Sequence, residues 1–153
     1  MIFISHRGNI DGPIPERENS PDYIDEAIKF GVDVECDVRY DNGFWLGHDE
    51  RQYKVDESWL LKRSQHLWLH AKDFESLKLL ARHRSYYRVF WHQNDNFSLV
   101  GMHHIWCHGQ TDNLKSECII PLLSKDEVIN CNYSGFGGVC SDYILDCKRK
   151  FHD

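Results

Sequence analysis

The stretch VDVECDVR, residues 32–39, decides how the rest of the chain is interpreted. In a β-strand successive side chains point to opposite faces, so the valines and the cysteine share one face. The other face carries Asp33, Glu35, Asp37 and Arg39. On a solvent-exposed antiparallel sheet this alternation is ordinary. In a parallel barrel the apolar face meets the helices, and the charged face points into the barrel, where enzymes of that architecture place their chemistry.

Glu35 and Asp37 are predicted to form a site for one divalent metal ion. Carboxylates at positions i and i+2 of a strand are ~6.6 Å apart at the backbone, and both can reach one hard cation lying between them. Burying carboxylates without a partner is costly, so the barrel interpretation requires a metal or a basic partner here. Mg²⁺ or Ca²⁺ is the expected ion, because both prefer oxygen ligands.

Short apolar runs elsewhere in the chain predict strands at residues 2–6, 32–38, 44–48, 67–72, 87–92, 103–108, 118–123 and 137–143. Helix-start and turn signals are found at Ser20-Pro21, Asp73, Ser124 with Glu127, and Asn42-Gly43. The alternation of strands and helices predicts one domain over residues 1–153, an α/β fold with mostly parallel strands. A regular eightfold barrel takes ~250 residues, so we expect an abbreviated or irregular TIM-type (β/α) barrel.

Several predicted strands end in ionisable residues: His6 with Arg7, His48 with Asp49, His70 with Lys72, and His92 beside Gln93. A lone histidine at a strand end is usually structural, but repetition at four strand ends indicates a shared site. Trp68 and Trp106 have the parity of residues that face the barrel interior. One of them is expected to form an apolar wall against the alcohol group of a substrate.

Composition excludes some classes of partner. The net charge is −6 and the basic residues are scattered, so no nucleic-acid partner is expected. No apolar stretch approaches membrane-spanning length, and the start of the chain does not resemble a signal peptide. The six cysteines form no CxxC pair, which favours reduced thiols and a cytoplasmic location. A homo-oligomer is expected where short late crossovers leave apolar strand surface to be covered.

Five motifs follow one another in the chain: HRG at 6–8, ENS at 18–20, VECDV at 34–38, NGFWLGHD at 42–49 and GGVCSDY at 137–143. Together they resemble the glycerophosphodiester phosphodiesterases, which belong to the phospholipase-C-like phosphodiesterase superfamily. The match is dense in the first third of the chain and weak in the last strand. The resemblance implies a distorted (β/α) barrel that hydrolyses phosphodiesters with one bound divalent metal.

The resemblance also implies roles for residues of the first third. His6 and His48 match the acid/base pair, and Arg7 matches the phosphate-binding arginine. Glu35 and Asp37 match two metal ligands. Glu18 matches the glutamate of the family's ENT motif, in or beside the site.

A departure from the family pattern concerns residues 70–72, where the chain reads HAK and the family has E-x-K. Lys72 is kept, and the resemblance implies that it contacts the phosphate. His70 stands where the family has its third metal ligand. Imidazole suits Mn²⁺ or Zn²⁺ better than Mg²⁺ or Ca²⁺, so His70 either changes the metal preference or contacts the phosphate instead.

The expected function is metal-dependent hydrolysis of a glycerophosphodiester or a similar small phosphodiester. Two histidines would transfer protons, and the nucleophile would be water or a hydroxyl of the substrate itself, which would give a cyclic phosphate first. Two alternatives stay open. One is a catalytically inactive module that binds a phosphate ligand on the same fold. The other is a phosphodiesterase for another phosphodiester or for a pyrophosphate, such as a nucleotide-sugar.

Overall fold

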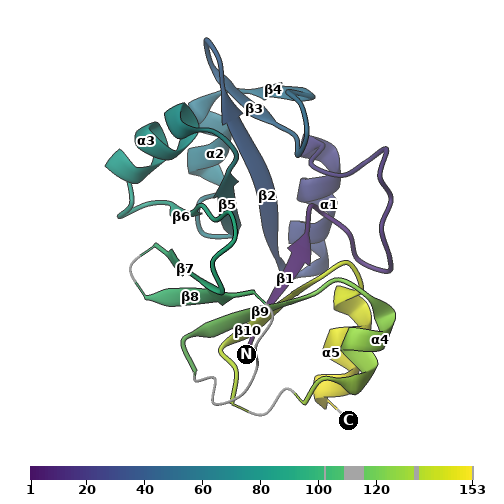
Figure 1. The fold of residues 1–153 in the computed structure, drawn as a ribbon. Coiled ribbons are helices and arrows are strands. Elements are labelled where there is room, and N and C mark those ends of the chain that lie inside the picture. Colours follow the sequence, from purple (N-terminus) through teal and green to yellow (C-terminus); the bar gives the residue numbers. More distant parts are fainter. Residues whose placement is uncertain (102, 109–115, 133–134, 153) are drawn as a thin grey trace.

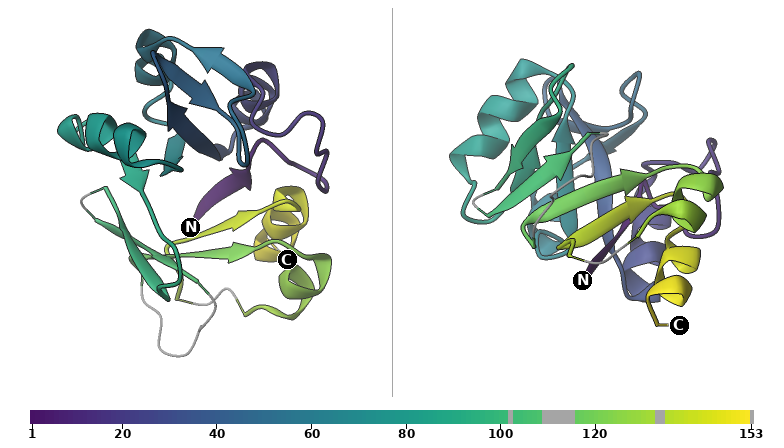
Figure 2. Two further views of the ribbon diagram at one scale, coloured as in Figure 1. Left: turned by 45° about the horizontal axis from the view of Figure 1, so that its top comes forward. Right: turned by 60° about the horizontal axis from the view of Figure 1, so that its bottom comes forward.

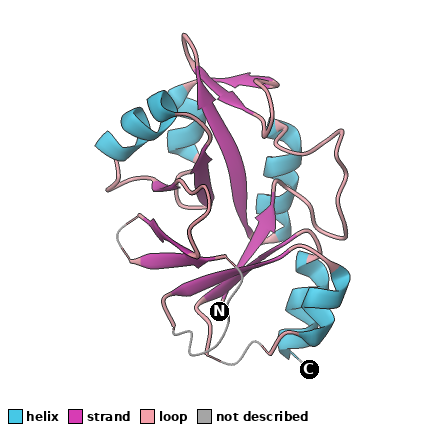
Figure 3. Ribbon diagram, in the orientation of Figure 1, coloured by secondary structure: helices cyan, strands magenta, loops and turns pink. Residues whose placement is uncertain are grey.

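The computed structural model describes residues 1–101, 103–108, 116–132 and 135–152 (Figure 1). Strands run through the centre of the molecule and the helices lie on their outer side (Figure 3). In chain order the elements are β1 (Ile2–His6), α1 (Pro21–Phe30), β2 (Asp33–Tyr40), β3 (Phe44–Leu46), β4 (Tyr53–Val55), α2 (Glu57–Lys62), β5 (Leu67–Ala71), α3 (Phe74–Arg82), β6 (Arg88–Phe90), β7 (Phe97–Val100), β8 (His104–Cys107), β9 (Cys118–Leu122), α4 (Lys125–Asn130), β10 (Gly138–Ser141) and α5 (Ile144–His152).

The ten strands of the described residues belong to one sheet, and most of its pairs are parallel. The strands β6, β5, β2, β1, β10, β9 and β8 follow one another with parallel pairing. The carboxyl-terminal end of β2 (Val38–Tyr40) also pairs with β3 in an antiparallel hairpin, and β3 pairs with β4. Two turned views show the sheet curving so that β1 and β10 lie between its two ends (Figure 2).

The sheet is not closed within the described residues. At one end β7 runs antiparallel to β8, and a backbone hydrogen bond from Gly101 N–H to the Val89 carbonyl, 3.2 Å long, links its end to β6. No ladder joins β6 and β7 there. The predicted mostly parallel α/β fold is therefore confirmed, whereas a closed TIM-type barrel is not observed.

Two apolar cores lie on the two faces of the curved sheet. The larger core packs the outward side chains of the strands against the helices and includes Ile24, Val34, Leu69 and Leu80. The inner core takes one side chain from each of several central strands: Ile4, Trp68, Phe90, Val100, Trp106, Ile119 and Cys140. Both faces of β2 are consequently buried, which excludes the solvent-exposed antiparallel interpretation of residues 32–39.

Most sequence-predicted elements are present. The Asn42-Gly43 turn joins β2 to β3, with φ values of 49° and 134° at its two residues. The helix beginning after Ser20 ends at Gly31, which has a left-handed backbone. Three elements were not predicted, namely β4, α2 and β7. No helix of the described residues is long and apolar enough to cross a membrane.

Asp73 joins α3 to β2 and provides a test of this packing. Its carboxylate accepts hydrogen bonds from Ser76 N at 2.8 Å, as an N-cap, and from Tyr40 N at 3.0 Å. Asp73→Ala is expected to lower the free energy of unfolding by about 1–2 kcal/mol, measured by urea denaturation. Asp56→Ala is the matched control, because Asp56 caps α2 without a side-chain hydrogen bond and should cost about 0.5 kcal/mol or less. Equal costs for the two variants would contradict this role.

Candidate functional site

The inner face of the sheet is built in two layers. Side chains two residues apart on a strand share a face, so on five strands an inner-core residue is followed by a second inward side chain with a polar group, nearer the carboxyl end. The pairs are Ile4 and His6, Trp68 and His70, Phe90 and His92, Trp106 and His108, and Cys140 and Asp142. Since the carboxyl ends of parallel strands lie at one edge of the sheet, the second layer gathers polar groups in one place.

A cavity of about 400 Å³ opens at this edge. Its walls are formed by His6, Arg7, Glu35, His48, His70, Lys72, Phe90, His92, Gln93, Trp106, His108, Pro121 and Leu123. Most of the site residues predicted from the sequence therefore line one space. Glu18, Asp37 and Trp68 do not line it, and their positions are given below.

Glu35 and Asp37 lie side by side beneath the cavity, with 2% and 0% of their surface exposed. One ligand atom from each, together with one ring nitrogen of His70, can be chosen so that all three lie within 4.8 Å of one another. Glu35 Oε2 and Asp37 Oδ1 are buried without a hydrogen-bond partner among the described residues. Buried acceptors of this kind are rare and costly, so the pair fits a divalent cation.

The pKa values of the two carboxyl groups are shifted in opposite directions. Burial raises the pKa of Glu35, and the neighbouring charge of Asp37 raises it further. Burial would also raise the pKa of Asp37, but contacts with His70, Arg7 and Asn19 outweigh this effect and lower it. Asp37 is thus held as an anion. A positive charge added nearby would lower the raised pKa of Glu35 and favour its ionised form.

His70 lies where the third ligand was predicted. Its Nδ1 is 3.3 Å from Asp37 Oδ1 and 3.7 Å from Glu35 Oε1. Two carboxylates and one imidazole form a donor set that suits Mn²⁺ or Zn²⁺, and the oxygen donors alone also suit Mg²⁺ or Ca²⁺.

His6 is held by a carboxylate that the sequence analysis did not select. Its Nδ1 is 2.7 Å from Asp142 Oδ1, and its Nε2 is 3.9 Å from Glu35 Oε2. Asn9 Nδ2 donates to the same Asp142 oxygen at 2.7 Å. Burial alone would lower the pKa of His6, but the hydrogen bond with Asp142 and the charge of Glu35 outweigh it and raise the pKa. Asp142 directly follows the last strand, so the strand-end rule that selected the histidines could have found it.

Arg7 adopts a left-handed backbone, with φ of 54°, immediately after β1. This turn directs its guanidinium back over the buried carboxylates, where Nε is 2.9 Å from Asp37 Oδ2. Arg7 Nη1 donates to Glu18 Oε2 at 3.1 Å, so Glu18 lies beside the site, as expected. Gly8 continues the turn with φ of 96°, and a Cβ there would lie 2.8 Å from the Tyr23 ring. These contacts explain the HRG motif physically.

His48 reaches the cavity from the loop after β3. Arg39 fixes this loop, because its guanidinium donates to the carbonyls of Gly47, at 3.1 Å, and of His48. His48 Nδ1 is 2.8 Å from Asp49 Oδ1. The side chain of His48 is 39% exposed, compared with 15% for His6, so the two imidazoles occupy wetter and drier parts of the same cavity.

Lys72 and the two tryptophans complete the comparison with the sequence. Lys72 Nζ is 3.8 Å from Asp37 Oδ1 and lines the cavity. Trp106 also lines it, as does His92. Trp68 faces inward as predicted but belongs to the deeper layer, where its Nε1 donates to Asp33 Oδ2 at 2.9 Å. Of the two tryptophans, Trp106 therefore lines the cavity and Trp68 does not.

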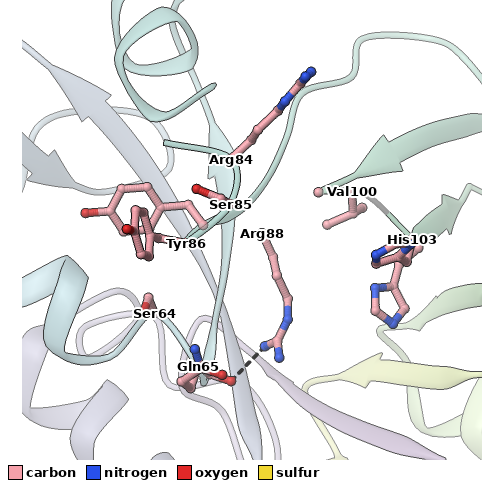
Figure 4. A pocket seen from close by; sticks show the side chains of 11 residues that line it. Ser64, Gln65, Arg84, Ser85, Tyr86, Arg88, Val100 and His103 are labelled. Carbon is pink, nitrogen blue, oxygen red and sulfur yellow. Dashed lines mark hydrogen bonds between the residues drawn. The ribbon is translucent and has the colours of Figure 1, made fainter. Parts of the chain in front are cut away.

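A separate cavity of about 170 Å³ lies at the opposite, amino-terminal ends of β5, β6 and β8 (Figure 4). Arg88 extends along it toward Gln65, whose carbonyl accepts a hydrogen bond from Arg88 Nη1 at 2.8 Å, and His103 lies on the other side. The same Arg88 atom is 3.2 Å from Asp33 Oδ2. Arg88 is thus already paired, and none of the sequence-predicted site residues lines this cavity.

Comparison with protein-family models, with curated proteins and with solved structures gave no match for this chain.

Metal binding at the Glu35, Asp37 and His70 cluster should stabilise the folded protein. Mn²⁺ at 100 times its dissociation constant is expected to add about 2.7 kcal/mol, seen as a rise in the melting temperature that EDTA reverses. Glu35→Gln should abolish most of this rise. Glu26→Gln is the control, since Glu26 is an exposed carboxylate on α1 and should leave the rise unchanged. An Mn²⁺ effect that persists in Glu35→Gln would place the ion elsewhere.

The contact between His6 and Asp142 predicts a pH dependence in protein kept free of metal by EDTA. The folded-state pKa of His6, measured by NMR, should exceed 6.5 and should fall in Asp142→Asn. Because the folded-state pKa is raised, protonated His6 stabilises the fold. That contribution is complete below about pH 6.5 and is lost as the pH rises through the folded-state pKa. An unchanged His6 pKa in Asp142→Asn, with exposed Asp22→Asn as the control, would exclude this coupling.

Proposed function

We propose that this chain is a metal-dependent phosphodiesterase that hydrolyses a small phosphodiester, with His6 and His48 as the proton-transfer groups. The observation that carries the proposal is the composition of the 400 Å³ cavity. It combines the imidazoles of His6 and His48 and two cationic side chains with a buried carboxylate cluster that fits a divalent cation. Breaking a phosphodiester needs a proton acceptor, a proton donor and positive charge around the phosphoryl oxygens, and these residue types supply them.

Arg7 and Lys72 are proposed to bind the phosphate. Both line the cavity, at 2.9 Å and 3.8 Å from oxygens of Asp37. The guanidinium can hold two phosphoryl oxygens in a bidentate manner, and the ammonium acts as a point charge. When a divalent cation is bound to the carboxylates, it supplies further positive charge and lowers the pKa of a hydroxyl near it.

His6 is the better oriented of the two proton-transfer groups. Its Nδ1 is engaged by Asp142, which leaves Nε2 as the ring nitrogen directed toward Glu35 and the cavity. A carboxylate on one ring nitrogen fixes the tautomer and the orientation of the imidazole. His6 is assigned the removal of the proton from the attacking hydroxyl, and His48, which is more exposed, the protonation of the departing alcohol. The attacking hydroxyl belongs to water or to the substrate's own alcohol, so no protein nucleophile is required.

The curved sheet is interpreted, within this proposal, as an irregular form of the (β/α) barrel that the sequence motifs imply. The order of the parallel strands from β6 to β8 and the filling of the inner face support this interpretation. Glycerophosphodiesters or similar small diesters are the proposed substrates.

The second candidate function is an inactive module that binds a phosphate ligand. Arg7, Lys72 and a metal would be sufficient for that role. The pairing of His6 with Asp142 favours the enzyme, because binding alone does not require an imidazole whose tautomer is fixed by a buried carboxylate.

Hydrolysis of bis(p-nitrophenyl) phosphate tests the proposal directly. With Mn²⁺, the wild-type protein should release p-nitrophenol, and EDTA should abolish the release. His6→Ala is expected to lower kcat by about 10²–10⁴-fold, the usual contribution of a general acid or base. Glu35→Ala should lower activity to the EDTA level. His83→Ala is the control, because His83 is an exposed residue at the end of α3. Activity that survives both His6→Ala and Glu35→Ala would refute the mechanism.

A further inference from the structure

The cavity has a second half that the proposed chemistry does not use. Its wall is formed by the rings of Phe90, His92, Trp106 and His108, which we call the ring wall. Pro121 and Leu123 line the cavity as well. Arg7, Glu35, His48 and Lys72 belong to the charged half, so one cavity joins an ionic region to an uncharged one.

Together with His70, the rings of the ring wall form one continuous stack. Trp106 stacks on Phe90 with centroids 4.6 Å apart, and Phe90 stacks on His70 at 4.8 Å. His70 stacks on His92 at 5.1 Å, and His92 stacks on His108 at 3.7 Å. The planes of successive rings differ by 8–28°. Rings stacked in this way present their edges sideways, and such edges favour the face of another planar ring.

Burial lowers the pKa of His92 to about 4, and the neighbouring His108, His70 and Lys72 lower it in the same direction. Burial, together with the neighbouring His70, also lowers the pKa of His108. A neutral imidazole offers one hydrogen-bond donor and one acceptor.

The ring wall also has unused hydrogen-bonding capacity. His92 Nδ1 is buried without a hydrogen-bond partner among the described residues. Gln93 follows directly, lines the cavity as well and carries a side-chain amide. A hydrocarbon chain in this half would leave His92 Nδ1 unpaired, which is costly.

A cationic alcohol, such as a quaternary ammonium group, is also disfavoured. Among the described residues that line the cavity, Glu35 is the one with a carboxylate, and it belongs to the charged half. Lys72 and Arg7 line the same cavity and repel cations. The ligand that fits is planar, uncharged and able to form hydrogen bonds along its edge.

We propose that the ring wall, with Gln93, binds a nucleobase, so that the substrate is a phosphodiester of a nucleoside. This inference rests on the proposed phosphodiesterase site, because the charged half must hold the phosphate. The base would lie across the ring edges and form hydrogen bonds with His92 and the Gln93 amide, which can pair with the edge of a base. The cavity volume of about 400 Å³ accommodates a nucleoside monophosphate rather than a longer oligonucleotide.

Binding of two product-like ligands tests this proposal without relying on catalysis. Adenosine 5′-monophosphate and glycerol 3-phosphate carry the same phosphate and differ in the alcohol. Isothermal titration calorimetry with EDTA-treated protein should show at least about 10-fold tighter binding of the nucleotide, as expected from base stacking. The double variant His92→Ala, His108→Ala should lose this preference and keep its affinity for glycerol 3-phosphate. His83→Ala should keep the preference.

Equal affinity of the wild-type protein for the two ligands would overturn the nucleoside proposal, whatever the hydrolysis assay gives. Loss of affinity for both ligands in the double variant, with its melting temperature preserved, would overturn the assignment of these histidines to base binding. His108→Phe keeps a ring at this position, so it should retain most of the nucleotide preference even where the double variant does not fold. Nucleotide binding that is intact in a protein without hydrolytic activity would contradict the phosphodiesterase proposal alone.

Discussion

The burial of two carboxylates on one face of a central strand is the constraint on which the rest of the site depends. Glu35 and Asp37 are less exposed than most apolar residues of the protein, and buried anions must be compensated. Compensation comes from three directions: Arg7 after β1, His70 from β5, and Lys72 just beyond it. Each of these groups lines the cavity that opens above the carboxylates. The contacts that compensate the buried carboxylates are thus the same contacts that form the candidate site.

Local backbone strain near these carboxylates follows from that constraint. Arg7 and Asn19 are two of the three non-glycine residues with positive φ among the described residues, at 54° and 62°. They are joined to each other by a hydrogen bond from Asn19 N to the Arg7 carbonyl, 3.0 Å long. The amide of Asn19 both donates to the Asp37 carboxylate and accepts from the Asp37 backbone. Left-handed residues persist where surrounding contacts over-determine them, and the buried Asp37 supplies those contacts.

The sequence predicted the site better than it predicted the edges of the fold. Strand parity placed His6, Glu35, Asp37, His70 and Lys72 on the inner face correctly, because period-two alternation depends on local geometry alone. The strands β4 and β7 were missed, since they are short and lack a continuous apolar run. Parity gave Trp68 and Trp106 the same inward direction but could not decide which of them reaches the cavity. Trp106 lines it and Trp68 does not. Asp142 follows the last strand and His108 ends the predicted strand 103–108, so the strand-end rule that selected the other histidines could also have selected these two residues.

From the sequence alone came the alternation of strands and helices, the inward faces of the strands and the residue types that they carry. These depend on near-neighbour geometry and on helix and turn signals, which are written locally in the chain. Only the tertiary structure decided which strand ends meet and that His6 is paired with Asp142. It also decided that β7 runs antiparallel to β8, and that rings from β5, β6 and β8 stack on one another. Those features join residues far apart in the chain, and their energies depend on burial and on contacts that exist only once the sheet has curved.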